Sequence, residues 1–249
     1  MVDNRFATAL VIGSVLSLLA TVYLSVAIGT QQWYQYRSPP DNREASNATE
    51  LSEEFINAEF DEKAYSDTLF RLNGTLGLWW RCVQAPGLSH WFKEPDPKMV
   101  TKCVSFTLAQ QFVPKFNEPG NHNSGEDLIR TYLWRCQFLL PLVSLALVFL
   151  SVLIGVCACL CRSLTPTLGV GVLHLLACLC SLGTVCCFLV GMDLLHRSLL
   201  PDSVDGSLGW SLYLALISSP LQMMAAALFL WAARSHRQNY TRMTAYRVA

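Results

Sequence analysis

The sequence predicts an integral membrane α-helical protein, in which a bundle of four transmembrane helices carries a small extracellular antiparallel β-sheet. The chain is 52% hydrophobic and only 14% charged, with no net charge. Its apolar residues gather in four long segments, and the polar segment between the first two contains two well-separated cysteines, Cys82 and Cys103. Disulfides persist in oxidising compartments, so these cysteines place the polar segment outside the cell.

Each apolar segment is long enough to cross the hydrocarbon core as a helix, which takes about 20 residues. None of them contains Asp, Glu, Lys or Arg. The first could instead be a signal peptide, because Ser25-Val26-Ala27 resembles a cleavage site. Its apolar stretch exceeds the roughly 7 to 15 residues of a signal sequence, so a span is favoured. The predicted spans are residues 6–28, 138–161, 168–192 and 210–233.

Basic residues in short loops predict the orientation of the chain. Arg5, Arg162 and the four arginines of residues 234–249 fall on one side of a four-helix topology, and this side is expected to be cytoplasmic. Long translocated loops largely escape this charge rule. We therefore expect cytoplasmic segments at residues 1–5, 162–167 and 234–249, and extracellular loops at residues 29–137 and 193–209.

Glycosylation sequons agree with this orientation. Asn47 and Asn73 each begin an Asn-x-Thr pattern in the longer loop, and both are candidate N-glycosylation sites. A third pattern at Asn239 lies on the expected cytoplasmic side, where it would not be used.

The cysteine pair predicts a disulfide that stabilises the extracellular domain. Joining Cys82 to Cys103 would contribute roughly 3 kcal/mol on the chain-entropy model. The alternatives are that both remain unpaired, or that Cys136 takes part, although Cys136 is more simply a buried thiol at the start of the second span.

Strand-like runs predict a small antiparallel sheet around this disulfide. Residues 69–72, 75–83 and 99–106 have this character, and Asn-Gly, Pro-Gly and Pro-Asp-Pro turn signals separate them. Upstream, residues 38–67 form an acidic insertion that is expected to be solvated, with a short amphipathic helix around residues 53–65. Cation binding by this insertion is the alternative interpretation.

A tryptophan followed by a Gly-Leu-Trp-x-x-Cys…Cys pattern resembles the signature of the claudins. The resemblance implies a left-handed four-helix bundle, an edge strand from the second extracellular loop, and an adhesion or junction protein. It leaves open whether Arg130 or Arg135 is the family's basic residue near the outer end of the second helix. The signature residues carry over to Trp33, Gly77, Leu78, Trp79, Cys82 and Cys103.

Several features depart from the claudin pattern. The two cysteines stand 21 positions apart, farther than in claudins, and the acidic insertion lengthens the loop. Val104 follows the second cysteine where channel-forming claudins place a selectivity charge, so a paracellular pore is disfavoured. The chain ends in Val248-Ala249 rather than Tyr-Val, so anchoring to a PDZ scaffold is not expected.

Several cysteines and one histidine lie within or beside the spans. Cys157, Cys159 and Cys161 are palmitoylation candidates near a cytoplasmic membrane end; their spacing does not favour a metal site. His174 is expected to be neutral and hydrogen-bonded rather than a proton relay. Small residues spaced by four at Gly183, Cys187 and Gly191 favour close helix packing over dimerisation.

The sequence shows no catalytic constellation, so we predict neither an enzyme nor a cofactor. The leading hypothesis is a plasma-membrane protein that contributes to cell–cell adhesion or junctional barrier control. The alternative is an auxiliary subunit that modulates a channel, receptor or signalling protein in the same membrane; a transporter is poorly supported because the spans lack charges. Expected partners are membrane lipid and other claudin-like tetraspans in cis or trans, but not nucleic acid.

Overall fold

A computed structural model describes residues 4–39, 48–57, 71–87, 98–113, 125–161, 165–199 and 204–248. The chain forms two compact units. The helical unit comprises Met1–Val26, Leu139–Val185 and Leu214–Ala249, and the sheet unit comprises Ala27–Phe138 and Cys186–Tyr213. Each unit has its own pattern of burial.

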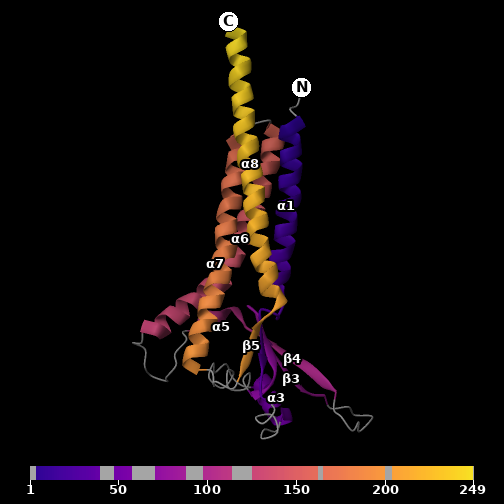
Figure 1. The fold of residues 1–249 in the computed structure, drawn as a ribbon, viewed down its shortest axis with the longest axis vertical. Helices are drawn as coiled ribbons and strands as arrows, with labels where there is room; N and C mark the ends of the chain where they lie inside the picture. The colour runs from indigo at the N-terminus through magenta and orange to yellow at the C-terminus, as the bar shows by residue number, and fades with distance from the viewer. Residues whose placement is uncertain are drawn as a thin grey trace. The chain divides into compact units, whose positions relative to one another are not determined.

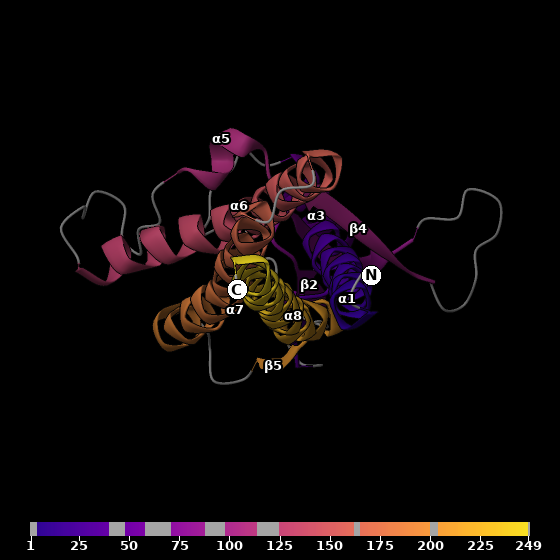
Figure 2. The same cartoon turned by 90° about the horizontal axis from the view of Figure 1, so that it is seen from above.

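Four long helices supply the helical unit: α1 (Asn4–Gly29), α6 (Gly125–Cys161), α7 (Thr165–Leu199) and α8 (Trp210–Val248). In this unit they run side by side (Figures 1 and 2). Within the described part of the chain, these four are long and apolar enough to cross a membrane. Neither Pro141 in α6 nor Pro220 in α8 ends its helix.

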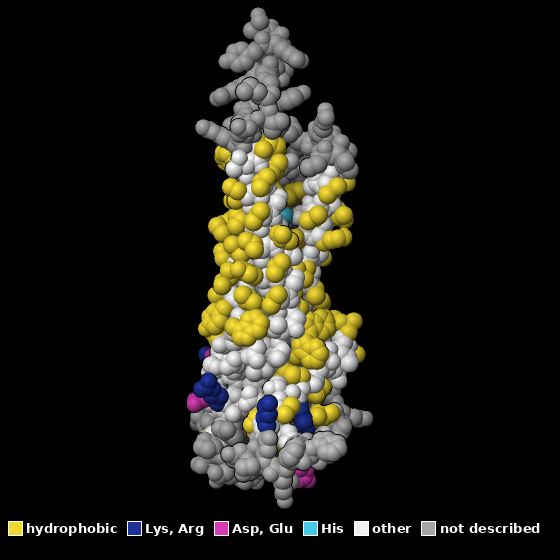
Figure 3. Space-filling model, turned by 90° about the vertical axis from the view of Figure 1, so that its right-hand side faces the viewer, with side chains coloured by type: hydrophobic (Ala, Val, Ile, Leu, Met, Phe, Trp, Pro, Cys, Tyr) yellow, Lys and Arg dark blue, Asp and Glu magenta, His cyan; other side chains and the backbone are white. Residues whose placement is uncertain are grey.

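Many apolar side chains of these helices point outward rather than into the unit. Figure 3 shows many hydrophobic side chains on one face of the helices. Exposed apolar residues of the helices include Leu18, Phe149 and Leu179. In the four span windows only 22% to 39% of the residues are buried. An apolar outer surface of this kind is expected for helices that cross the hydrocarbon core of a membrane, as in the predicted multi-pass fold.

Small and hydroxyl side chains fill the interior of the helical unit. Ser144 Oγ donates to the Ala177 carbonyl at 2.9 Å, which links α6 to α7. His174 Nδ1 lies 2.9 Å from the Val170 carbonyl, which can only accept, so this nitrogen carries a proton. Its Nε2 lies 2.7 Å from the Ser17 hydroxyl of α1. This arrangement suits the neutral, hydrogen-bonded histidine that the sequence favours.

The sheet unit is built on five strands in the order β4-β3-β2-β1-β5, and every neighbouring pair is antiparallel. The strands β1 and β5 pair through residues distant in sequence, which confirms the edge strand that the claudin resemblance implies from the second loop. Figure 1 shows β3, β4 and β5 in this unit. The strands are β1 (Tyr34–Arg37), β2 (Gly74–Leu76), β3 (Trp80–Pro86), β4 (Met99–Ser105) and β5 (Asp205–Leu208).

The observed sheet differs from the predicted one in three details. The expected strand over residues 75–83 is divided in two, because a turn at Gly77 lets β2 and β3 pair with each other. The expected strand over residues 69–72 is not one where it is described, since Arg71 is helical and Leu72 lies in a bend. The strand β1, which the sequence analysis did not identify, lies between the central strand β2 and the edge strand β5.

A short helix, α3 (Ala48–Asn57), comes from the acidic insertion and packs against β3 and β4. It begins before the helix expected around residues 53–65, and residues 58–65 lie outside the described chain. Phe55 is buried at 2% exposure, and the Lys102 ammonium donates to Ser52 Oγ at 3.0 Å. The described part of the insertion therefore belongs to the packed sheet unit.

Candidate functional site

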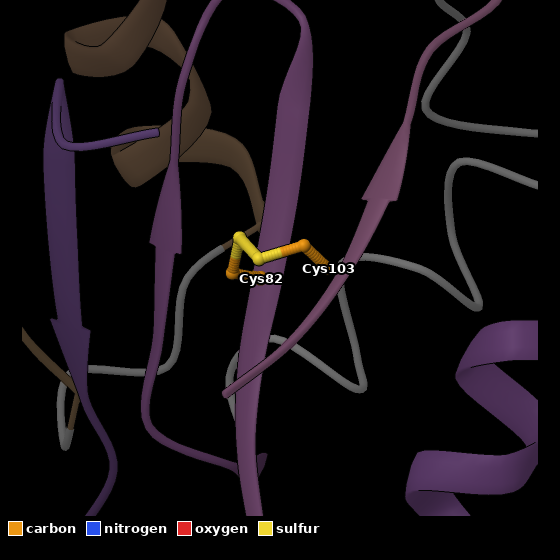
Figure 4. The surroundings of a disulfide bond; sticks show 2 residues. All are labelled: Cys82 and Cys103. Carbon is orange, nitrogen blue, oxygen red and sulfur yellow. A yellow bond between two sulfur atoms is a disulfide. The ribbon is translucent and has the colours of Figure 1, made fainter. Parts of the chain in front are cut away.

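The disulfide between Cys82 and Cys103 joins the two longest strands of the sheet (Figure 4). The two residues stand directly opposite each other in the β3–β4 register, with Cα atoms 4.1 Å apart. Cys82 is fully buried, whereas Cys103 is exposed. Of the pairings left open by the sequence, the structure has the one between these two cysteines, and Cys136 is free.

The Gly77-Leu78-Trp79 segment makes the turn between β2 and β3. The Gly77 amide donates to the Trp80 carbonyl at 2.8 Å. A Cβ on Gly77 would lie 2.6 Å from the Thr30 carbonyl oxygen and 2.8 Å from Gln31 Cα, so a larger residue would push the backbone apart. This close approach explains the glycine at the first position of the motif.

The next two residues of the motif connect the turn to neighbouring helices by a hydrogen bond and an aromatic contact. Leu78 is buried, and its carbonyl accepts a 3.0 Å hydrogen bond from Gln111 at the end of α5 (Leu108–Gln111). The Trp79 ring meets Phe138 of α6 edge to face, with centroids 4.8 Å apart. Such aromatic pairs add about 0.5 to 1.5 kcal/mol beyond their buried area.

Trp33 stands beside the same turn. It is fully buried, its indole nitrogen donates to the Ala27 carbonyl at 2.7 Å, and its backbone amide donates to the Leu76 carbonyl at 3.0 Å. Its ring lies 5.0 Å from that of Phe188 on α7. The signature residues thus share one unit, with Trp33 and the Gly-Leu-Trp turn adjoining and the disulfide farther along β3.

A buried arginine lies within the same motif, and sequence reasoning did not identify it. Arg81 is only 3% exposed, and its guanidinium carbon lies 4.3 Å from the Phe106 ring centroid and 5.8 Å from that of Trp134. Residues alternate across a strand, so Arg81 shares a face with Val83 and Ala85. That alternation was the signal for its burial, because Val83 and Ala85 are apolar positions.

Two tyrosines of β1 pack against the last turns of α7. The Tyr34 ring lies 4.9 Å from Tyr36 and 5.2 Å from His196. Burial raises the pKa of Tyr34 above its ordinary value. The pKa of Tyr36 is also raised, first by burial and then by Tyr34, while Arg81 opposes the shift. Both phenols therefore remain neutral over the physiological pH range.

The two candidate basic residues of α6 differ in their surroundings. Arg130 is buried at 7% exposure. Arg135 is partly exposed, and its Nη2 donates to the Phe112 carbonyl at 2.9 Å. Arg135 thereby links the segment after α5 to α6, but neither position is singled out as the family's basic residue.

The predicted modification sites are only partly described. Asn73 stands just before β2, and its side-chain oxygen accepts from the Ser38 amide at 2.9 Å. Asn47 lies outside the described residues. Cys157 is an exposed free thiol on α6, whereas the side chains of Cys159 and Cys161 lie outside the described part of the structure.

The comparison with protein families agrees with this geometry. A family model described as PMP-22/EMP/MP20/Claudin tight junction matches residues 18–231. The match covers most of the chain and includes every residue of the Trp…Gly-Leu-Trp-x-x-Cys…Cys signature.

Proposed function

The chain belongs to the PMP-22/EMP/MP20/claudin family of multi-pass membrane proteins, and on this premise we propose that it contributes to cell–cell adhesion or to control of the paracellular barrier. In this proposal the protein lies in the plasma membrane with both termini in the cytoplasm. The proposal rests on the five-stranded sheet, in which a disulfide links Cys82 to Cys103. The protein acts through contacts with other proteins and not by catalysis.

The outward face of the sheet supports a contact role. Gln84, Thr101 and Ser105 alternate with the covered positions of β3 and β4 and are exposed and uncharged. At the start of β4, Met99 shares this face and is 50% exposed, whereas Val100 stands opposite Ala85 on the other face and is 45% exposed. A partner that contacts this end of β4 could bury both apolar side chains without desolvating a charge.

The charge next to the disulfide favours a barrier over an ion-selective pore. Lys102 precedes Cys103, but it is half-buried and donates to Ser52 of α3. Val104, the following residue, is apolar and half-buried. A permeating ion would meet a lysine that is already hydrogen-bonded within the molecule, which weakens its use as a selectivity charge.

Mixed monolayers of expressing and non-expressing cells test the adhesive role. We expect tagged protein to concentrate where two expressing cells meet, and a Met99→Ser/Val100→Ser variant to lose most of this enrichment. Leu208→Ser is the matched control, because Leu208 is 40% exposed on β5, at the opposite sheet edge. Cys103→Ser, which removes the staple, should also reduce the enrichment.

Surface biotinylation must show that each variant reaches the plasma membrane. Equal labelling of every border by the wild-type protein would contradict the adhesive role. If Leu208→Ser lowers the enrichment as much as the Met99→Ser/Val100→Ser variant does, the adhesive contact does not lie at the start of β4.

An auxiliary subunit in the same membrane is the second candidate. The broad exposed apolar surface of the four spans favours it, because a lateral partner could bury part of that surface. Uniform surface labelling, together with a channel or receptor that cross-links to the spans, would support this function over adhesion.

We also propose that Cys157 is acylated, since it is an exposed thiol at the end of the predicted second span. Acyl-biotin exchange on wild-type protein and on Cys157→Ser tests this: the signal should fall in the variant. An unchanged signal would assign any acylation to other cysteines.

A further inference from the structure

Three buried polar side chains of α8 form a group that we call the α8 polar cluster: Ser218, Ser219 and Gln222. Ser218 and Gln222 are fully buried, and Ser219 is 4% exposed. Neither serine hydroxyl has a hydrogen-bond partner within the protein, and nor does either end of the Gln222 amide. Among the described residues of the helical unit, all the buried side-chain nitrogen and oxygen atoms without such a partner belong to this cluster.

Helix geometry brings the three side chains together. Ser218 and Ser219 precede Gln222 by four and three positions, and residues at these spacings are neighbours on a helix surface. Side chains on a helix lean towards its N-terminus, so Gln222 covers the turn that holds both serines. The cluster therefore places two hydroxyls and one amide on the same buried part of α8.

Other buried hydroxyls of the helical unit have partners within the protein. Ser144 of α6 donates to the Ala177 carbonyl of α7 at 2.9 Å, and the Ser17 hydroxyl of α1 lies 2.7 Å from His174 Nε2 on α7. Ser181 donates to the Ala177 carbonyl of its own helix at 2.7 Å. Direct hydrogen bonds thus link α1 and α6 to α7, and the α8 polar cluster departs from this pattern.

The depth of the cluster makes unpaired polar groups costly. It lies near the middle of the candidate span Trp210–Ser235. In a bilayer whose hydrocarbon core is about 30 Å thick, this depth is about 15 Å from either interface. Lipid chains offer no hydrogen bonds there, so a buried amide at this depth needs partners from another polar molecule.

We propose that the α8 polar cluster is an internal binding site for water. Gln222 offers two N–H donors and one carbonyl acceptor, and each serine hydroxyl can donate and accept. The ligand must therefore be able to donate and to accept as well. It must also be neutral, because residues 210–233 contain no charged side chain to balance an ion. Buried waters make about three hydrogen bonds each to polar groups of this kind.

The burial of the cluster and its small neighbours also favour water. A lipid head group cannot reach side chains that have almost no exposed surface. Along the same part of α8, Ala215 precedes Ser218 by three positions and Ala225 follows Gln222 by three, and both are fully buried. Methyl groups on either side of the cluster suit a ligand as small as water. Bound water then supplies the cluster with the hydrogen bonds that Ser17 and Ser144 make directly.

Solid-state NMR of the full-length protein in bilayers of perdeuterated lipid tests the site. The protein carries ¹⁵N-labelled glutamine, and proton magnetisation is transferred from water to the side-chain amides at short mixing times. Gln222→Met removes the amide from a side chain of similar length, so the signal that it abolishes is that of Gln222. We expect the buried Gln222 amide to receive magnetisation from water, as the exposed Gln84 amide does.

Serine variants make the assignment specific. Ser218→Ala/Ser219→Ala removes two partners of the bound water and should lower the transfer to Gln222 by about two-fold or more. Ser144→Ala is the matched control, because it removes a buried hydroxyl near the middle of the α6 span that donates to a protein carbonyl. It should leave the transfer unchanged. The proposal is overturned if Gln84 receives magnetisation from water and Gln222 does not, or if the double serine variant transfers as strongly as the wild type.

Discussion

The sheet unit and the helical unit bury polar groups in different ways. In the sheet unit, the buried polar side chains include large ones such as Arg81 and Gln111, held by aromatic rings and by the carbonyl of Leu78. In the helical unit they include Ser144 and Ser181, which donate to helix carbonyls, and His174, which pairs with Ser17. The two units also differ in covalent support, because the disulfide lies in the sheet unit.

This difference follows from two solvents. A sheet folded in water gains from withdrawing apolar surface, and its large buried groups must find partners inside. Helices in lipid gain little from burying Leu, because the lipid is equally apolar, so close approach of small residues and short hydrogen bonds holds them together. Ala177, Ala225 and Ala232, all at 0% exposure in the helical unit, show the second pattern.

Truncating the buried arginine should give the largest effect on stability. Arg81→Ala removes a cation that lies against the Phe106–Trp134 ring pair and leaves a cavity, so we expect a loss of about 3 kcal/mol from the sheet unit. Arg81→Lys keeps the charge but not the planar group that stacks on the rings, and should lose about 1 kcal/mol. Hydrogen exchange of β3 and β4 amides in nanodiscs measures both.

The amides of the helical unit serve as the internal reference for these variants. Their exchange should be unchanged, because the sheet unit has its own core. A lysine variant as stable as the wild type would show that charge, and not ring stacking, is what Arg81 supplies. If the variants destabilised both units equally, the sheet unit would not have a core of its own.

An added methyl group should lower the stability of the helical unit on one side of α7 and leave it unchanged on the other. At Gly171 a Cβ would lie 2.7 Å from Leu230 Cγ and 3.1 Å from the Leu230 backbone nitrogen, so Gly171→Ala should cost about 2 kcal/mol. Gly169→Ala is the control, since nothing lies within 4 Å of its Cβ. Unfolding in detergent with added SDS should separate the two variants; similar midpoints would contradict close packing at Gly171.

Much of the architecture could be predicted because its signals are local. Four charge-free apolar segments indicate the spans, and the match of residues 18–231 to the family model agrees with the Trp, Gly-Leu-Trp and cysteine pattern. The disulfide partners followed from their isolation in a polar segment. These features depend on composition and spacing, which a single sequence displays.

Features that depend on distant pairing could not be predicted with the same success. The strand β1 is only four residues long, and it is defined by pairing with β2 and β5 rather than by its own pattern. The turn at Gly77 was read as strand because the apolar run continues through it. The burial of Arg81 was not predicted, because its aromatic neighbours Phe106 and Trp134 come from outside its own strand.

The smallest expected effect concerns the hydrogen bond between α1 and α7. Ser17 and His174 are both buried, with 2.7 Å between the hydroxyl oxygen and Nε2. Interhelical hydrogen bonds in membranes average about 0.6 kcal/mol, because the separated helices also find polar partners. We therefore expect Ser17→Ala to cost about 0.6 kcal/mol in the same SDS unfolding measurement.

Ser14→Ala is the matched control for this bond, since Ser14 is exposed one turn earlier and donates to the Leu10 carbonyl of its own helix. A double-mutant cycle with His174→Ala isolates the pair. A coupling energy near zero would mean that packing alone joins α1 to α7, whereas a value well above 1.7 kcal/mol would exceed the largest such coupling seen for membrane helices. Either result would change the view that many weak polar contacts, and no single strong one, hold the helical unit.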